Sequence, residues 1–211
     1  YPRNLYAAFI STLDERIGAL LKKLDELGIK DNTIIVFQSD NGHSTEQRAH
    51  FGGGNAGPYR GAKSSLFEGG IRVPAAITWP NKIQKGAIRN QFGVNSDWMP
   101  TLAELCGIKL DQQDLDGKSL VSVINNEKEK TQHTEGYCWQ YQDMWVARKG
   151  HWKLLGNPRD TSKKTYKLKE KRFLVNLDDD ISETKNLAKK YPNKVVELEN
   201  QYRNWLIKNK N

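Results

Sequence analysis

The sequence has little cysteine: Cys106 and Cys138 are the only two among its 211 residues. Two cysteines exclude a disulfide-rich scaffold and a zinc site of four cysteines, and the sequence leaves open whether they pair. A chain of this length can bury a hydrophobic core, so it does not need disulfides to fold. The length fits one large domain, or one domain with a small appendage.

Long hydrophobic runs are also missing. No apolar stretch approaches the roughly 18–20 residues that cross a bilayer, so we expect no membrane span. The first ten residues lack the basic and apolar regions of a secretory signal peptide. The sequence opens on Tyr-Pro-Arg rather than on Met, and we therefore expect an excised or processed piece of a longer protein.

Acidic residues are fewer than basic ones. The chain has 33 Lys+Arg against 25 Asp+Glu, which gives a formal net charge of +8. Residues 148–172 contain ten basic and two acidic residues, so this segment alone accounts for the whole excess. Such a segment is either a solvated hairpin or a patch that binds a polyanion, and the sequence leaves both open.

Hydrophobic periodicity in the first part of the chain indicates an α/β fold. Apolar residues recur every three or four positions from Leu5 to Leu27, which predicts an amphipathic helix that ends at Gly28. The run 33–38 is short, β-branched and apolar on both faces, as in a buried parallel strand. A helix followed by such a strand is half of an α/β unit. Further elements are predicted as a strand at 75–79 and helices at 97–106 and 119–124.

The pattern changes after about residue 130, where aromatic side chains punctuate short β-like runs. Residues 144–155 predict a hairpin that turns at Lys149-Gly150, and residues 173–177 predict a further strand. Residues 193–208 place apolar side chains on one side of a helix. We therefore predict an α/β part in residues 1–130 and a small antiparallel sheet with a closing helix in residues 131–211.

Asp40 and Asn41 directly follow the predicted strand 33–38. Open α/β sheets bind ligands at the carboxyl ends of their strands, and hard oxygen ligands suit Ca²⁺ or Mg²⁺ better than zinc. Asp-Asn-Gly is also an ordinary turn sequence, and this alternative stays open. A glycine-rich loop of roughly twenty residues follows, and loops of that length in compact domains are usually functional.

Lys63 and His43 are the candidate substrate contacts. Lys63 lies just beyond the glycine-rich loop and could pair with an anionic group held by a nearby cation. The loop is not a phosphate-binding Walker A motif, because Lys63 follows Ala62 rather than glycine. His43 could bind a substrate or act as an acid or base. The alternatives are a surface lysine and a loop histidine whose polar atoms are satisfied within the protein.

Six segments in a fixed order resemble the type I sulfatases, the arylsulfatase-like members of the alkaline-phosphatase superfamily. They are residues 13–28, 31–42, 60–74, 96–107 with 115–120, 146–154 and 176–188. The segment 31–42 is similar to the strand of the family that ends in metal ligands, and 60–74 is similar to the segment whose lysine contacts the sulfate. The likeness runs nearly from end to end and corresponds to the C-terminal half of the family.

The resemblance implies a sulfuric ester hydrolase that uses Ca²⁺, or alternatively Mg²⁺, and a formylglycine that attacks sulfur. By matching positions it assigns Asp40 and Asn41 to the metal, and Lys63 to catalysis and substrate binding. His43 is expected to bind the substrate at the border of the cleft, together with Arg48, His50 and the loop to Tyr59. The implied fold is the C-terminal part of a sulfatase/alkaline-phosphatase-like sandwich, with a small antiparallel β subdomain and a terminal helix.

The formylglycine motif of the family is absent from this sequence. The family makes this residue from cysteine in Cys-x-Pro-Ser-Arg or Cys-x-Ala-x-Arg, and neither Cys106 nor Cys138 stands in such a motif. We therefore expect the nucleophile and the remaining metal ligands in a missing N-terminal half, and we expect these 211 residues alone to be inactive. The expected substrate is a sulfated carbohydrate or an aryl sulfate, with a sulfated glycan preferred, and we expect no nucleic-acid partner. The family suggests a periplasmic or secreted location, or a lysosome in a eukaryote.

Two other functions remain alternatives. A phosphodiesterase or phosphomutase-like enzyme of the same superfamily would use two zinc or manganese ions, whereas Asp40-Asn41-Gly42 suits one hard cation better. A binding module for a sulfated glycan or a nucleic acid would use the segment 148–172, with Trp145, Trp152 and Tyr166 as stacking platforms.

Overall fold

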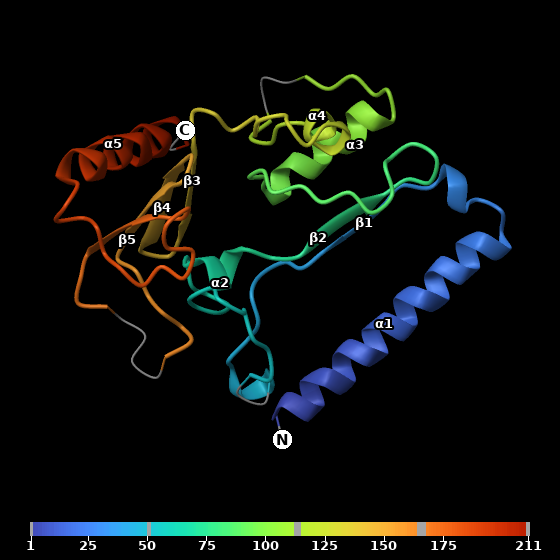
Figure 1. Ribbon diagram of the computed structural model, residues 1–211, viewed down its shortest axis with the longest axis horizontal. Coiled ribbons are helices and arrows are strands. Elements are labelled where there is room, and N and C mark those ends of the chain that lie inside the picture. The colour runs from blue at the N-terminus through green and yellow to red at the C-terminus, as the bar shows by residue number, and fades with distance from the viewer. Residues whose placement is uncertain (1, 50–51, 112–114, 164–167, 210–211) are drawn as a thin grey trace. The chain divides into compact units, whose positions relative to one another are not determined.

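The computed structural model describes residues 2–49, 52–111, 115–163 and 168–209 (Figure 1). In chain order the elements are α1 (Pro2–Glu26), β1 (Ile35–Gln38), α2 (Glu68–Ile71), β2 (Ala75–Thr78), α3 (Trp98–Leu105), α4 (Val121–Asn125), β3 (Tyr137–Tyr141), β4 (Met144–Lys149), β5 (Trp152–Gly156), β6 (Arg172–Asn176) and α5 (Pro192–Lys208). Short 3-10 turns lie at Lys30–Asn32, Gln47–Ala49 and Asn95–Asp97. The predicted α/β class, with an antiparallel sheet and a terminal helix, is confirmed.

The chain folds into two compact units. Unit 1 combines residues 1–30, 36–76 and 137–211, and unit 2 combines residues 31–35 and 77–136. The chain thus leaves unit 2 after Gly136, close to the predicted domain boundary at residue 130. The division into domains 1–130 and 131–211 itself stays a prediction.

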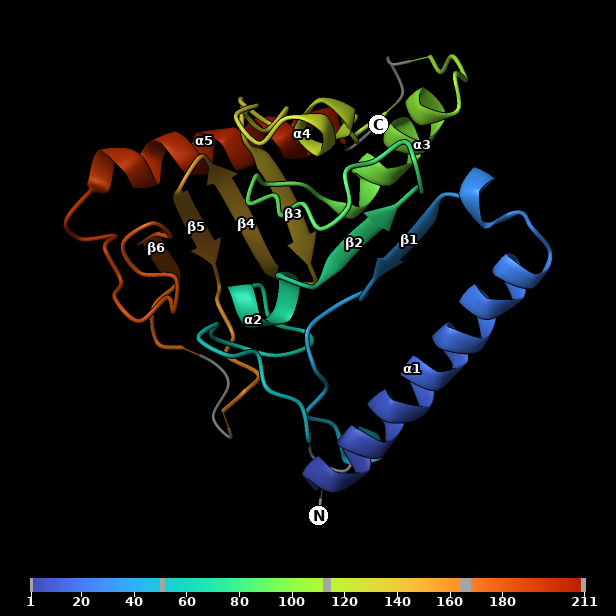
Figure 2. The ribbon, with the colours of Figure 1, turned by 45° about the vertical axis from the view of Figure 1, so that its right-hand side comes forward.

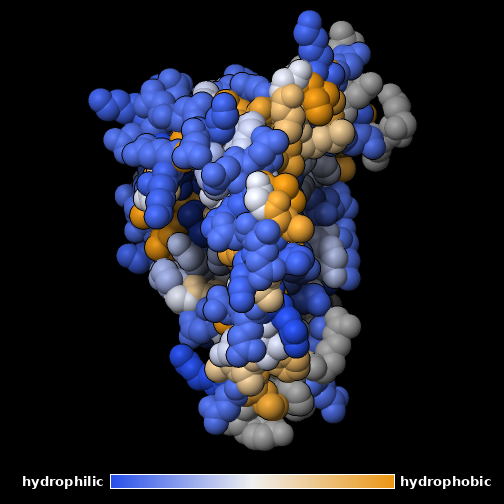
Figure 3. Space-filling view, turned by 90° about the vertical axis from the view of Figure 1, so that its right-hand side faces the viewer, coloured by the Kyte–Doolittle hydropathy of each residue, from blue (hydrophilic) through white to orange (hydrophobic). Residues whose placement is uncertain are grey.

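Helix α1 forms where the apolar periodicity predicts it, but its apolar stripe is not buried. Phe9 is 68% exposed, Leu20 is 59% exposed and Leu27 is 57% exposed. None of its described side chains is buried. Figure 3, which views the face on the α1 side of Figure 1, shows hydrophobic side chains exposed among hydrophilic ones. The periodicity therefore identifies a helix with one apolar face, and nothing in the described part of the chain covers that face.

Among the described residues, β1 does not match the prediction of a buried parallel strand at 33–38: its neighbour is antiparallel, and its side chains are half-buried or exposed. β1 forms a two-stranded sheet with β2, and the arrows of the two strands point in opposite directions in Figure 2. Beyond their ends, the Ser39 N–H donates to the Pro74 carbonyl at 3.2 Å, as an antiparallel pair requires. Phe37 on β1 is 46% exposed. The apolar pattern of residues 33–38 indicates a strand with two apolar faces. It does not indicate the direction of β2, which depends on the long connection between β1 and β2.

The C-terminal sheet has the strand order β3-β4-β5-β6, and all its neighbouring pairs are antiparallel. The predicted hairpin is confirmed, since β4 ends at Lys149 and Gly150 takes a positive φ of 58° in the turn. Alternate residues of β4 enter two hydrophobic clusters, with Val146 in one and Trp145 in the other. Helix α5 covers one face through Leu198, and Phe67 packs on the other. Both faces of this small sheet are therefore buried.

An aromatic stack holds α5 on the sheet. Trp145 on β4 and Tyr202 on α5 lie with ring centroids 4.2 Å apart and planes within 4° of each other. On the neighbouring strand, a Cβ added at Gly156 would lie 2.0 Å from the Trp145 indole, so only glycine fits there. Trp145 therefore stacks on Tyr202 inside the protein, instead of presenting its ring as a stacking platform for bases or sugars.

Among the described residues of the basic segment 148–172, four basic side chains are engaged in ion pairs. Arg159 Nη2 lies 2.6 Å from Asp143 Oδ1, Lys149 Nζ lies 3.9 Å from Glu197 Oε1, and Arg172 pairs with Glu199. Lys153 is fully buried. Lys164 and Lys167, together with Tyr166, lie outside the described residues. Part of the charge that is continuous in the sequence is therefore compensated in separate ion pairs.

Unit 2 is organised around a buried carboxylate. Asp97 is fully buried and accepts hydrogen bonds from the backbone N–H groups of Val94 and Lys118, each at 2.8 Å. Its Oδ1 lies 2.9 Å from Nε2 of the buried His133. The two cysteines do not pair: Cys106 in unit 2 is exposed, and Cys138 on β3 is buried, which raises the pKa of its thiol to about 12.

Candidate active site

Asp40 and Asn41 lie immediately after β1, at its carboxyl end. The Ser39 hydroxyl donates to the Asn41 carbonyl at 2.9 Å and shapes the turn. Asp40 is exposed and Asn41 is half-buried. Within the described ranges no hydrogen bond or ion pair occupies either side chain, so their oxygens remain available to a ligand.

Glycine lets the turn after β1 lie directly against α2. The Gly42 N–H donates to the Gly70 carbonyl at 2.9 Å. A Cβ added at Gly42 would lie 1.9 Å from the Gly69 carbonyl oxygen, and one at Gly69 would lie 2.6 Å from the Arg60 carbonyl oxygen. Side chains are therefore excluded at both positions, and the two backbone segments can touch.

The structure brings Lys63 and His43 together. The Lys63 N–H donates to the His43 carbonyl at 2.9 Å, although the two residues are separated by the glycine-rich loop. Lys63 Nζ lies 3.5 Å from Glu46 Oε2, and both side chains are partly exposed. An exposed pair of this kind contributes little stability, so an anionic ligand can replace Glu46 at low cost.

His43 differs from an ordinary loop histidine. Its Nδ1 is buried and has no hydrogen-bond partner in the described part of the chain. Burial lowers the pKa of His43 below its ordinary value of 6.5. Burial therefore favours the neutral imidazole over the cation.

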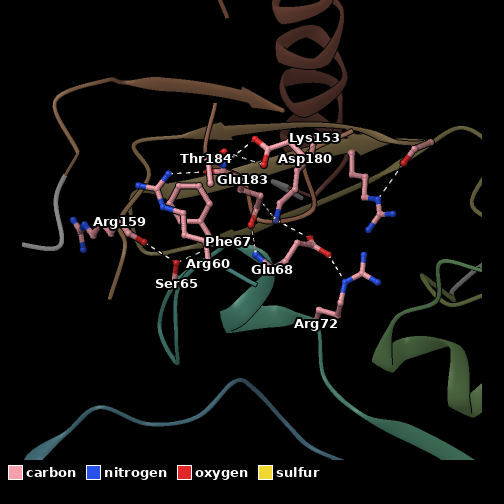
Figure 4. Close-up of polar contacts among 12 residues, drawn as sticks. Arg60, Ser65, Phe67, Glu68, Arg72, Lys153, Arg159, Asp180, Glu183 and Thr184 are labelled. Atoms are coloured by element: carbon pink, nitrogen blue, oxygen red, sulfur yellow. Dashed lines mark hydrogen bonds and ion pairs between the residues drawn. The ribbon is translucent and has the colours of Figure 1, made fainter. Parts of the chain in front are cut away.

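A buried ionic network supports the segment that contains Lys63 (Figure 4). Lys153 Nζ on β5 lies 2.8 Å from Glu68 Oε1 on α2 and 2.9 Å from Glu183 Oε1. Arg72 Nε lies 2.7 Å from the other oxygen of Glu68. Lys153 and Glu183 are 0% exposed, and Glu68 is 2% exposed. The network joins α2 to the C-terminal sheet within unit 1.

The two carboxylates of this network titrate differently. Burial by itself would raise the pKa of Glu68, but the charge and hydrogen bond of Lys153 and the charge of Arg72 lower it to about 2. Burial raises the pKa of Glu183, and the charge of Glu68 adds to this effect. Glu68 is therefore the fixed anion beside Lys153 at neutral pH.

Arg60 makes a second connection to the C-terminal part. Its Nε donates to Asp160 Oδ2 at 2.9 Å, and its Nη1 donates to the Glu183 carbonyl at 2.9 Å. The guanidinium lies 4.2 Å from the ring centre of Phe67 (Figure 4). Burial tends to raise the pKa of Asp160, but hydrogen bonds from Ser162 and Arg60 outweigh it and lower this pKa below its ordinary value.

Several residues at the site gave no signal in the sequence. Glu46, Thr45 and Thr161 have no motif, and the Thr161 hydroxyl bonds to a carbonyl 99 positions away in the chain. Of the other expected cleft residues, His50 and the side chain of Arg48 lie outside the part that the structure describes. Among the described residues, no three His, Cys, Asp or Glu side chains are grouped to hold a metal ion. The roles of Asp40, Asn41, His43 and Lys63 stay predictions.

Comparison with known proteins identifies the family. The family model described as Sulfatase matches residues 1–108. A second model, described as N-sulphoglucosamine sulphohydrolase, C-terminal, matches residues 60–210. A sulfatase of Formosa agariphila is 32% identical over 97% of this chain. The chain therefore belongs to the sulfatase family, as its motifs predict.

Individual relatives agree with this assignment. The steryl-sulfatase of Homo sapiens is 35% identical over 62% of this chain. The crystal structure of Ps i-CgsB in complex with k-i-k-neocarrahexaose is 27% identical, covers 97% of this chain and superposes with a TM-score of 0.80. The predicted sulfatase-type fold is thus confirmed.

The chain spans less than half the length of these relatives: 40% of the Formosa sulfatase, 23% of the human steryl-sulfatase and 43% of the Ps i-CgsB chain. None of the helices in the described ranges combines the length and hydropathy that crossing a membrane requires.

Proposed function

We propose that the protein hydrolyses sulfate esters and that this chain supplies part of the metal site and one contact to the sulfate. The observation that supports this most directly is the hydrogen bond from the Lys63 N–H to the His43 carbonyl. It joins the segment of the lysine to the strand end of Asp40 and Asn41, in a member of the sulfatase family. A backbone hydrogen bond thus connects the segment that carries Lys63 with the segment that carries Asp40, Asn41 and His43.

The proposed metal is Ca²⁺, with Mg²⁺ as the alternative. The carboxylate of Asp40 and the amide oxygen of Asn41 are hard donors, and no described residue occupies them. This donor set fits part of a calcium site, whose other ligands we expect in an N-terminal half. When bound, the cation would neutralise charge on the sulfate oxygens.

The residues of this chain would act on the sulfate group itself. The Lys63 ammonium would exchange Glu46 for a sulfate oxygen and stabilise the negative charge that develops as the ester bond breaks. The neutral His43 would donate one hydrogen bond to the substrate. The formylglycine nucleophile is expected outside these residues, so the isolated chain should have no activity.

We propose a sulfated glycan as the substrate. The motivating observations are the Glu46 side chain beside Lys63, the backbone contact of Lys63 with His43, and the structural relative Ps i-CgsB, which was crystallised with k-i-k-neocarrahexaose. The human steryl-sulfatase is a relative whose name indicates a different class of ester. A periplasmic, secreted or lysosomal location is part of the same proposal and rests on the family resemblance.

The proposal is tested by joining the chain to the N-terminal half of a sulfatase that contains formylglycine. The joined enzyme should hydrolyse 4-nitrophenyl sulfate to 4-nitrophenol and sulfate. The variant Lys63→Met should lower kcat/KM for this substrate by about a hundredfold or more. Lys185→Met, at an exposed lysine of unit 1, is the control and should leave kcat/KM unchanged. Faster hydrolysis of bis(4-nitrophenyl) phosphate than of the sulfate would instead support the phosphodiesterase alternative.

Metal binding is tested by calorimetry on the same joined enzyme. Asp40→Ala should weaken calcium binding by at least about tenfold, because it removes a charged oxygen ligand. Asp31→Ala, at an exposed aspartate of unit 2, should not change the affinity. Equal calcium affinity in the wild type and in Asp40→Ala would contradict the metal assignment.

The substrate class is tested with His43→Ala. This variant should lose turnover of a sulfated oligosaccharide, measured as released sulfate, more than turnover of 4-nitrophenyl sulfate. Equal losses on both substrates would place His43 at the sulfate group or in a structural role.

A further inference from the structure

Three consecutive residues of the β5–β6 connection contact the segments that contain Lys63 and His43. The Arg159 carbonyl accepts a hydrogen bond from the Ser65 hydroxyl at 2.7 Å. The Asp160 carboxylate accepts one from Arg60 at 2.9 Å. The next residue, Thr161, makes two such contacts. The residues 159–161 therefore lie along the candidate site, far from it in sequence.

Thr161 connects the two halves of the candidate site. Its hydroxyl donates to the Ala62 carbonyl at 3.0 Å, directly before Lys63. Its carbonyl accepts a hydrogen bond from the Thr45 hydroxyl at 3.3 Å, two residues after His43. The hydrogen bond from the Lys63 N–H to the His43 carbonyl completes a closed set of contacts.

We propose that Thr161 is a positioning residue for Lys63. It acts through the backbone, because it fixes the peptide before Lys63 against the segment after His43. This inference rests on the proposed sulfatase function. A displacement of about 1 Å in a group that stabilises charge can lower a rate by up to about a hundredfold, so a single hydrogen bond at this place affects turnover.

The surroundings hold Thr161 in place independently of its own hydroxyl. Asp160 is 2% exposed, and besides Arg60 it accepts a hydrogen bond from the Ser162 hydroxyl. Arg159 is paired with Asp143. Because its neighbours are fixed on both sides, loss of the Thr161 hydroxyl frees the Ala62 carbonyl rather than the residues 159–161.

The experiment is a double-mutant cycle on the joined enzyme. Thr161→Val, which removes the hydroxyl and keeps the shape, should lower kcat/KM for 4-nitrophenyl sulfate by about tenfold, mainly through kcat. In the Lys63→Met background the same change should have less than about a twofold effect, because the group it positions is absent. Thr161→Ser, which keeps the hydroxyl, should restore activity to within about twofold of the wild type.

A matched control separates positioning from general stability. Thr131 in unit 2 also donates its hydroxyl to a backbone carbonyl, that of Phe92 at 2.6 Å. Thr131→Val should leave kcat/KM unchanged. The proposal is overturned if Thr161→Val lowers kcat/KM by the same factor with and without Lys63, or has no effect with Lys63 present.

A second measurement does not depend on catalysis. In the 211-residue chain, Thr161→Val and Thr45→Val should each speed hydrogen exchange of the Lys63 amide by about fivefold, while Thr131→Val leaves it unchanged. Unchanged exchange in both variants would overturn the positioning role even if sulfatase activity is present. Faster exchange in an enzyme that lacks sulfatase activity would contradict the proposed function and leave the contact itself supported.

Discussion

Helix α1 and the segment 60–72 both belong to unit 1, yet they are stabilised in different ways. The segment 60–72 has buried side chains held by ion pairs to Lys153 and Asp160, whereas α1 has no buried side chain among those described. The segment 60–72 contains little regular secondary structure, since its one helix has four residues. Helix α1, in contrast, is 25 residues long. Regular secondary structure and tertiary fixation are therefore separate properties in this molecule.

The difference indicates where the chain needs a partner. Large exposed apolar patches are rare on monomeric proteins and are typical of interaction sites, so the exposed apolar face of α1 is a candidate interaction site. We propose that an N-terminal half of the protein covers it. The segment 60–72, by contrast, obtains its partners from β5 and from residues 159–183, all within this chain.

The largest loss of stability is expected from a change at Lys153, because it would release the segment 60–72 from the C-terminal sheet. Lys153→Met removes the buried cation between Glu68 and Glu183 and leaves Glu68 paired with Arg72, so the free energy of unfolding should fall by roughly 3–5 kcal/mol. Urea unfolding followed by circular dichroism measures the loss. Lys149→Met, at a half-exposed surface pair, should cost less than about 1 kcal/mol.

A rescue variant tests why Lys153→Met lowers the free energy of unfolding. Adding Glu68→Gln and Glu183→Gln to Lys153→Met removes the uncompensated charges and should recover part of the stability. No recovery would show that lost packing, rather than the lost compensation of the carboxylate charges, explains the fall in stability.

The next effect is a pH dependence confined to the buried network. The pKa of Glu68 is about 2 in the folded chain against an ordinary 4.5. The contribution of Glu68 to the free energy of unfolding is therefore present above pH 4.5 and is lost as the pH falls towards 2. The contribution of Glu183, whose pKa is raised, has the opposite sign and is lost as pH rises above its ordinary value.

The measurement compares the free energy of unfolding of the wild type and Glu68→Gln between pH 2 and pH 6. The wild type should lose about 3 kcal/mol more than the variant over this range, from about 1.4 kcal/mol per pKa unit. Parallel pH profiles of the two proteins would rule out Glu68 as the fixed anion of the network.

The smallest effect is expected on α1. Leu20→Ser and Phe9→Ser change side chains that are mostly exposed, so the free energy of unfolding of this chain should change by less than about 0.5 kcal/mol. Leu198→Ser in α5, at a fully buried side chain, is the contrast and should cost several times more. The α1 variants should nevertheless weaken association with an N-terminal half, measured by co-purification. A large loss of stability in the isolated chain would show that α1 is already packed.

The sequence predicted most elements because their signals are local. Periodicity defined α1 and α5, and Lys149-Gly150 defined the hairpin turn between β4 and β5. The direction and burial of β1 could not be predicted, because they depend on a strand that follows more than thirty residues later. The ion pairs of the basic segment 148–172 could not be predicted for the same reason: Asp143 and Glu199, which pair with Arg159 and Arg172, lie outside the segment.

The family resemblance, the candidate residues Asp40, Asn41, His43 and Lys63, and the apolar stripe of α1 can all be inferred from the amino-acid sequence, because each depends on neighbours along the chain. The folded structure is needed to place Lys153 as a buried cation between two carboxylates and Thr161 against Ala62. Burial and hydrogen bonding at these positions join residues 85 and 99 positions apart, and no local pattern encodes contacts over such separations.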